Sequence, residues 1–472
     1  MRKAFALTLA GLLAGCNLAP PHTRPALPTA TTFPAEFAGD VTLGTRASEI
    51  GWRDFFADQQ LESLLSQALA RNRDLAVTVA QIEEARGLYR IQAADRLPTL
   101  GATSDFTRTR TPLGTIAIPG AGDAGGSITQ NRYSVGVGVT SFELDFWGRV
   151  RNLSESARSQ YLATVQAERA FRLTLVRDVA STYFASREAA ERIALAEATV
   201  KSRQEGLRIA QRRLDAGVTS ALDYRQSETL LTTAEAELAA LRLTRAQSDN
   251  FLAVLVGGPV SGPLPAALPL AQQTKSPALA AGLPSDLMIA RPDVLGAEEQ
   301  LRAARANIGA ARAAFFPTIS LTGSFGFASQ TLKNLIDTDS ESWSFGPSLS
   351  LPIFDWGRNK GNLTVAKARG DIAVATYERT VQGAFREVAD ALAGRQYLAE
   401  QVAAQERGTL ATRRIADLAR TRYREGVAGY LEVLDAERNL FAAEQALIQL
   451  RRAQADNLVT LYVALGGGLL EG

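Results

Sequence analysis

The chain has 472 residues, of which 46% are hydrophobic and 21% are charged, and this excludes a chain that is disordered by composition. Its formal net charge is +2, and without Arg2 and Lys3 of the N-terminal segment the basic and acidic residues balance, so no nucleic-acid partner is indicated. The single cysteine, Cys16, and the single histidine, His22, exclude disulfides within the chain, Cys/His metal sites and Ser-His-Asp or Cys-His catalysis.

Residues 1–15 have the features of a lipoprotein signal peptide. A basic start, MRK, precedes the apolar run 4–14, which is too short to span a bilayer. The run ends in LAGC, which resembles a bacterial lipobox and predicts that Cys16 becomes the lipidated N-terminus. The alternative is a chance cysteine after an ordinary export signal. Asn17 follows where an Asp would favour the inner membrane, so we expect a lipid anchor in the outer membrane of a Gram-negative bacterium.

Two proline-rich stretches divide the rest of the chain. Residues 16–50 carry five prolines and predict an extended, lipid-anchored arm without a core of its own. The stretch 259–284, rich in proline and glycine, predicts a linker between two halves, 51–258 and 285–472.

The two halves are predicted to be internal repeats. Three features recur in one order: a proline that ends a helix, the triplet WGR, and a turn with glycine. They stand at Pro98 and Pro317, at Trp147 and Trp356, and at 213–218 and 422–427. The prolines are 219 residues apart and the other two features are 209 apart. The common order argues against chance similarity.

Each half predicts a helix, two strands and a long helical hairpin. Apolar residues alternate with serine or glycine in the strands, which is typical of a sheet with one apolar and one small polar face. Two prolines, Pro347 and Pro352, interrupt the last strand and make its ends uncertain. The expected helices are 75–97 and 294–316, the strands are about 99–112, 130–146, 317–330 and 342–354, and the hairpins are 150–256 and 358–465.

Four strands of this kind in an exported, lipid-anchored chain favour a membrane barrel. No stretch after the signal reaches the roughly 18 apolar residues of a membrane-spanning helix. Four strands cannot close a barrel alone, because open edges in lipid leave N–H and C=O groups unpaired. Two chains would supply about 8 strands and three about 12. A soluble sandwich with a serine-rich exterior is the alternative that alternation alone leaves open.

Five stretches together resemble outer-membrane factors of the TolC type, in the lipoprotein branch that serves tripartite RND (resistance-nodulation-division) efflux systems. They are GWRDFFADQQL at 51–61, RPDV at 291–294, FFP at 315–317, DWGR at 355–358, and the segment 426–435. The resemblance implies a mixed α and β fold. In it, a homotrimer forms a 12-stranded transmembrane β-barrel, with four strands per chain, continued by a long periplasmic α-helical barrel with an equatorial linker at 259–284.

The same resemblance implies a passive exit duct for drugs or other small molecules. A periplasmic adaptor and an inner-membrane RND-type transporter would open it at the periplasmic tip. The resemblance implies no enzymatic activity and no cofactor beyond the lipid on Cys16. An exit duct for type I protein secretion remains an alternative. A periplasmic scaffold lipoprotein is less favoured because of the duplicated strand pairs, and a carboxylate-based hydrolase because no segment gathers acids.

The resemblance also assigns functional positions. Glu432 and Asp435 match acids that face the pore at its narrowest point, where they can bind cations weakly. Tyr423 and Asp223 match a hydrogen-bonded pair that holds the tip closed, and Ala428 replaces an arginine of that lock. The turn residues matching adaptor contacts are Gly217, Val218, Gly426 and Val427.

Overall fold

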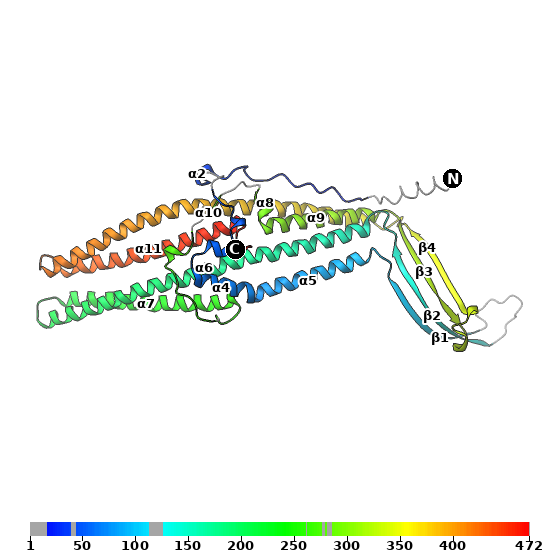
Figure 1. Ribbon diagram of the computed structural model, residues 1–472, viewed down its shortest axis with the longest axis horizontal. Helices are drawn as coiled ribbons and strands as arrows, with labels where there is room; N and C mark the ends of the chain where they lie inside the picture. Colours follow the sequence, from blue (N-terminus) through cyan, green and yellow to red (C-terminus); the bar gives the residue numbers. More distant parts are fainter. Residues whose placement is uncertain are drawn as a thin grey trace. The chain divides into compact units, whose positions relative to one another are not determined.

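The computed structural model describes residues 17–38, 44–112, 126–260, 262–275, 279–280 and 286–471 (Figure 1). The predicted signal peptide and Cys16 lie outside these residues, so lipid attachment stays a prediction. The chain divides into two compact units. The first contains the described part of Met1–Arg24 together with Glu83–Leu162 and Glu298–Ala375, and the second contains Pro25–Ile82, Ala163–Ala297 and Thr376–Gly472, again in their described parts.

The first unit contains one antiparallel sheet with the strand order β1-β2-β3-β4, visible from cyan to yellow in Figure 1. Its strands are β1 (Leu100–Pro112), β2 (Ser127–Glu143), β3 (Thr318–Ser329) and β4 (Glu341–Ser350). Within the described residues β1 pairs only with β2, and β4 only with β3. The sheet of a single chain therefore has two open edges.

The two faces of this sheet differ in chemistry. Val135 of β2 lies opposite Phe327 of β3, which places valine and phenylalanine side chains on one face. On the other face, hydroxyl groups join β3 to β4, with 2.8 Å between the Oγ atoms of Ser320 and Ser348. The aromatic rings of the apolar face are largely exposed in the single chain, as 72% exposure of Trp343 shows. An apolar face without a cover is expected of a sheet that lies in lipid.

Two strands end earlier than the sequence predicts. The predicted strand 130–146 corresponds to β2, which ends at Glu143 and is followed by a bend. The predicted strand 342–354 corresponds to β4, which ends at Ser350, two residues before Pro352. Proline has no N–H for a further ladder bond. Pro347 lies inside β4 opposite Leu321, and within the chain's own sheet its missing N–H is on the unpaired side of the strand.

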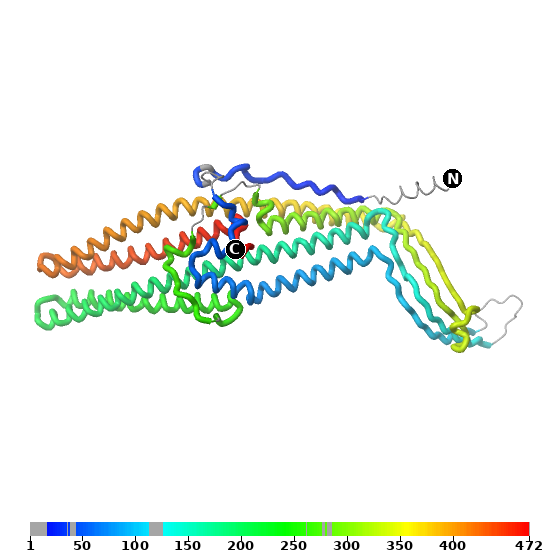
Figure 2. Tube along the Cα trace, in the orientation of Figure 1, coloured from blue at the N-terminus to red at the C-terminus, as the bar shows by residue number. Residues whose placement is uncertain are grey.

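Long helices continue from the strands. They are α5 (Arg73–Ala94), α6 (Arg149–Asp215), α7 (Ala221–Val256), α9 (Pro292–Ala313), α10 (Arg358–Arg424) and α11 (Tyr430–Ala464). Both α6 and α10 have 67 residues, about 100 Å at 1.5 Å per residue. Figure 2 shows that each runs into the next helix through a turn, which makes the hairpins α6-α7 and α10-α11. Among the described residues, no helix carries an apolar stretch sufficient to cross a membrane.

A glycine lets the second hairpin pack tightly. A Cβ at Gly394 of α10 would lie 2.1 Å from Oδ1 of Asn457 on α11. The Asn457 amide uses this space to donate to the Ala391 carbonyl oxygen at 2.9 Å. A side chain at position 394 would therefore push the two helices apart.

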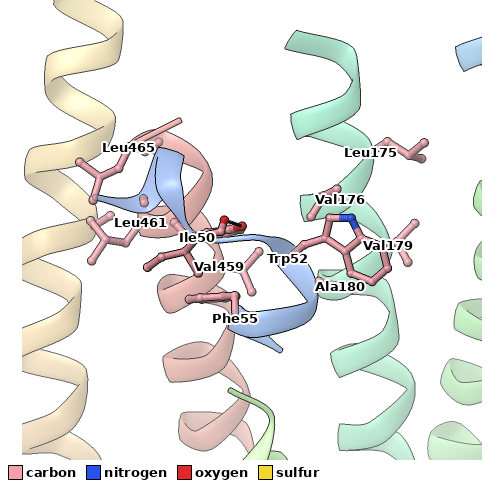
Figure 3. Close-up of a cluster of buried hydrophobic side chains, with 14 of the residues drawn as sticks. Ile50, Trp52, Phe55, Leu175, Val176, Val179, Ala180, Val459, Leu461 and Leu465 are labelled. Atoms are coloured by element: carbon pink, nitrogen blue, oxygen red, sulfur yellow. Dashed lines mark hydrogen bonds between the residues drawn. The ribbon is translucent and has the colours of Figure 1, made fainter. Parts of the chain in front are cut away.

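Short helices that the sequence did not predict surround the core of the second unit. They are α2 (Ala35–Ala38), α3 (Trp52–Phe55), α4 (Gln59–Arg71) and α8 (Leu287–Ala290), together with three-residue 3-10 turns. The Phe55 ring stacks on Tyr462 of α11, with 4.1 Å between centroids, and the Tyr462 hydroxyl donates to the Ile50 carbonyl oxygen at 2.6 Å. In Figure 3, Trp52 lies against Val176 and other small side chains of α6. The motif at 51–61 thus fills the space between α6 and α11.

A buried carboxylate attaches the linker to this core. Asp58 precedes α4 and is fully buried. Its side chain accepts hydrogen bonds from the backbone N–H of Gln60 at 2.9 Å, the Tyr183 hydroxyl at 2.6 Å and the backbone N–H of Leu268 at 2.9 Å. Burial, together with the hydrogen bond to Asp58, raises the pKa of Tyr183 far above its ordinary value. The expected linker 259–284 is therefore held to α6 in its described part.

The arm expected at 16–50 contacts helices of both units. In the first unit, Oε1 of Glu298 on α9 lies 3.1 Å from Nε2 of His22 and accepts a hydrogen bond from Nε of Arg24 at 3.1 Å. Arg312 donates to the Leu18 carbonyl oxygen at 2.9 Å. Burial raises the pKa of Glu298, but the hydrogen bonds from Arg24 and His22 outweigh it, so the net pKa is lowered. In the second unit, Phe33 stacks on a phenylalanine of α10. In its described part the arm packs on α9 and α10.

Candidate functional site at the two hairpin turns

The turns that join α6 to α7 and α10 to α11 lie at the same end of the second unit (Figure 2). Gly217 and Gly426 have φ values of +69° and +74°, a left-handed conformation that glycine adopts without strain. The backbone N–H groups of Val218 and Val427 each bond at 2.9 Å to the carbonyl oxygen five residues earlier. This helix-ending pattern usually buries the second residue against the helix. Here both valines are more than 60% exposed, so they offer an apolar surface.

The two helices that follow begin differently. Ser220 and Asp223 form a reciprocal capping box at the start of α7, with the Asp223 N–H at 3.2 Å from the serine hydroxyl. Thr219 donates its hydroxyl proton to the Asp223 carboxylate at 2.7 Å. The Thr219 hydrogen bond is the main reason that the pKa of Asp223 is lowered. By contrast, α11 begins after Gly429, which provides no side-chain cap. The acids of α11 are therefore not used in capping.

The predicted gate residues lie on the exposed face of α11. Their side chains are 43% exposed for Glu432 and 53% for Asp435. Glu432 pairs with Arg422 at 2.8 Å, and Asp435 pairs with Arg438 at 3.0 Å. A neighbouring face of α11 packs on small residues of α10; its buried residues include Val433, Ala436 and Leu440. Each predicted gate acid thus has an arginine partner in its own chain.

A groove with both apolar and polar lining runs beside Asp435 between α7 and α11. It has a volume of about 390 Å³. Leu222 and Leu230 of α7 and Leu431 of α11 line it. The polar residues of the lining are Arg225, Gln226, Thr229, Asp435 and Arg438. Leu222 and Leu431 are both more than half exposed. This groove therefore combines leucine side chains with charged and polar ones.

The two residues of the predicted tip lock each have another partner in this chain. Tyr423 and Asp223 are not hydrogen-bonded to each other in the described chain. The Tyr423 hydroxyl accepts from Arg213 of α6, whose guanidinium carbon lies 5.3 Å from the centre of the Tyr423 ring. Asp223 is held by its own capping box. The positive charge of Arg213 also helps to lower the pKa of Asp223. Arg213 therefore connects the two hairpins at the place where the sequence predicted an acid.

Three arginines of this site were not identified from the sequence. Arg438 stands three residues after Asp435 on one helix, a spacing that favours an ion pair and could have been recognised. Arg422 lies across the turn from Glu432, and Arg213 lies 210 residues from Tyr423. Contacts between different helices depend on packing that local spacing does not specify.

The charged groups of this site are paired with one another. Across the described residues, no group of three or more His, Cys, Asp or Glu side chains comes together in a way that could hold a metal ion. The two acids are paired with arginines, and the groove beside Asp435 is lined by leucines together with polar residues such as Gln226 and Thr229. Such a tip can contact another helix, carry a fixed charge pattern and change its packing.

Acid is expected to loosen the start of α7. The carboxylate of Asp223 has a lowered pKa in the folded chain, so its contribution to stability is present above its unfolded value of about 3.9 and is lost as the pH falls through the folded pKa. Asp223→Ala should produce the same loss at neutral pH. We expect faster hydrogen exchange of the α7 first-turn amides and a higher leak current in bilayers. The control is Asp215→Ala at the end of α6, and equal exchange in both variants would contradict the capping role.

Comparison with known proteins gives one consistent result. The family model described as outer membrane efflux protein matches residues 64–258 and 283–467. The cation efflux system protein CusC of Escherichia coli O6:H1 is 41% identical over 467 residues, covering 99% of this chain and 98% of that protein. The solvent efflux pump outer membrane protein SrpC of Pseudomonas putida is 43% identical over 469 residues, covering 98% and 97%. The solved open state of the Neisseria gonorrhoeae MtrE outer membrane channel is 39% identical, with a TM-score of 0.87 and coverage of 97% of this chain and 99% of that chain.

Proposed function

The chain belongs to the outer membrane efflux protein family and is an outer-membrane efflux channel of a Gram-negative bacterium. We propose that three copies of this chain form the exit duct of a tripartite efflux system. The observation that carries this proposal is the four-stranded sheet with two open edges. In lipid, each unpaired N–H or C=O group of such an edge costs several kcal/mol. Three copies would give a 12-stranded barrel, with the serine and glycine face toward water.

The long hairpins would continue this barrel as a helical tube in the periplasm. Each chain contributes α6-α7 and α10-α11, whose exposed leucines at the tip fit against the same helices of another copy. The lipid expected on Cys16 would hold the arm at the outer membrane. Transport through such a duct is passive, and the inner-membrane RND-type transporter supplies the energy.

We assign the gate to Glu432 and Asp435 at the tip. Threefold symmetry would place six carboxylates around one axis, each with the arginine partner that this chain provides. Arg213 and Tyr423 would favour the closed state because they join the two hairpins of each chain. A periplasmic adaptor opens the tip only if it binds the open state more tightly than the closed state.

The cargo is proposed to be chosen by the transporter. Relatives named for cation efflux and for solvent efflux are similar to this chain to nearly the same degree, 41% and 43% identity. Because similar ducts are named for such different molecules, we propose that this duct has no binding site that selects its cargo.

The adaptor-contact proposal has a direct test. Val218→Asp combined with Val427→Asp replaces two exposed apolar tip residues with charges, while the glycines that shape the turns remain. We expect efflux in cells that express the transporter and adaptor to fall at least tenfold, because an unpaired charge in an apolar contact costs more than about 1.4 kcal/mol. Channel conductance in bilayers should stay unchanged. Val218→Ala with Val427→Ala is the milder control, and full efflux in the charged variant would refute the assignment.

A further inference from the structure

The two strand pairs are related by fixed sequence offsets. In the first pair, Leu100 lies opposite Val139, and in the second pair Ile319 lies opposite Leu349. Ile319 follows Leu100 by 219 residues, and Leu349 follows Val139 by 210. The same two offsets convert every pair of the first register into a pair of the second wherever both are formed. The offset of 209 at WGR differs by one because β2 contains an irregularity between Val139 and Phe142.

A tryptophan joint connects the first repeat to the second. The indole N–H of Trp147 donates to the Pro317 carbonyl oxygen at 2.8 Å. Its ring stacks on Phe316, with 4.7 Å between centroids and 24° between planes. This joint fixes the end of β2 against the start of β3, next to the strand pair that links the two repeats.

The equivalent tryptophan of the second repeat has no such cover. Trp356 is 100% exposed and has a left-handed backbone with φ of +56°, which is uncommon for a bulky residue. The positions that correspond to Phe316 and Pro317 are Leu97 and Pro98, and Leu97 is 70% exposed. One chain therefore carries both halves of a second joint, and they belong to the two strands at its open edges.

We propose that Trp356 of each copy docks on Leu97 and Pro98 of the next copy, and that β4 pairs with β1 of that copy in one defined register. The register follows from β2 and β3, where Val139 lies opposite Gly323. Applying the offsets places Leu349 opposite Ser104 of the partner subunit and Ser344 opposite Thr109 of the partner subunit. The inference rests on the proposed assembly of copies and specifies its contacts.

Three properties of the strands agree with this register. It places all of β4 against β1, from Glu341 opposite Pro112 of the partner subunit to Ser350 opposite Thr103 of the partner subunit, without overhang. It keeps the apolar faces of both strands on the same side, whereas a shift by one residue would reverse one of them. It also sets the rings of Trp343 and Phe345 opposite arginines of β1, a favourable cation–π arrangement.

Engineered disulfides test the register. Cys16, the only native cysteine, lies far along the sequence from both strands. We would oxidise the double variants Ser344→Cys with Thr109→Cys and Leu349→Cys with Ser104→Cys in the membrane. Positions 344 and 349 belong to the two alternating kinds of antiparallel pair, so one variant samples the closely spaced kind. The expected product is a covalent trimer that reducing agent separates. The shifted controls, Ser344→Cys with Thr107→Cys and Leu349→Cys with Ala102→Cys, place the Cα atoms about 7 Å apart or more, too far for good disulfide geometry.

The outcomes are separable. A protein with the mass of three chains in which only the shifted controls cross-link, or in which no pair does, overturns the register and leaves the exit duct standing. A protein with the mass of one chain overturns the proposed assembly itself.

The tryptophan joint has its own test. Trp356→Ala should lower the temperature at which the assembled protein dissociates in detergent. The matched control is Phe354→Ala, two residues earlier and 89% exposed, which should leave this temperature unchanged. An equal shift in both variants would assign Trp356 to the lipid interface, where aromatic side chains also gather, and would overturn the docking.

Discussion

Replacing Glu432 with Gln and Asp435 with Asn is expected to make the channel prefer anions. The arginine partners, Arg422 and Arg438, remain after the acids are neutralised, so the tip changes from balanced to positive. Two unit charges about 7 Å apart in water interact by roughly 0.6 kcal/mol. Six lost carboxylates in the proposed trimer, with screening by salt, should change the cation-to-anion permeability ratio about tenfold, which corresponds to about 1.4 kcal/mol. Reversal potentials in planar bilayers under a salt gradient measure this ratio.

The arginines provide the matched control for that experiment. Arg422→Gln with Arg438→Gln should shift the permeability ratio toward cations and strengthen block by divalent cations. The variant with all four substitutions should return close to the starting ratio, because it removes acids and bases together. A ratio that stays constant across the series would show that these residues do not line the conducting path.

Replacing Asp58 with Ala should give the largest loss of stability. The substitution leaves the Leu268 N–H without its acceptor and removes one of the two or more acceptors of the Tyr183 hydroxyl and the Gln273 amide. A buried donor that loses its only partner costs about 1–3 kcal/mol, and loss of the Asp58 cap of α4 costs about 1 kcal/mol more, so we expect the free energy of unfolding to fall by about 2–4 kcal/mol. Urea titration followed by far-ultraviolet circular dichroism measures the change.

A nearby exposed acid controls for the loss of charge alone. Asp54 is exposed and lies four residues before Asp58. The substitution Asp54→Ala should change the free energy of unfolding by less than about 0.5 kcal/mol. Asp58→Asn should fall between the two, because an amide oxygen can still accept from the Gln60 N–H. Equal stability of Asp58→Ala and Asp54→Ala would mean that the linker is not held through this carboxylate.

The order of elements could be predicted because it depends on local signals. Two helices end near prolines, and alternating apolar residues mark the strands between them. The short helices α3 and α4 could not be predicted, because their residues are held by distant partners such as Tyr462 and Tyr183. The strand β4 was predicted too long because alternation continues past Pro352, where the hydrogen-bond ladder does not.

The tip shows the same division between local and distant information. The glycines Gly217 and Gly426 could be placed in turns from the sequence, since the required backbone conformation is a local property. The expected Tyr423–Asp223 bond was based on a family resemblance. In the structure the Tyr423 hydroxyl accepts a hydrogen bond from Arg213. An arginine at 213 has no local feature that points to a residue 210 positions away. The pairs Glu432–Arg422 and Tyr423–Arg213 therefore emerged only with the structure, whereas local spacing already favours Asp435–Arg438.

The number of chains in the extracted protein tests the central claim most directly. The claim is that three copies close one barrel, because the sheet of one chain has four strands and two open edges. Native mass spectrometry of the detergent-extracted, full-length protein should give a single species of three chains. A species of one chain, in the detergent that preserves channel activity, would contradict the account.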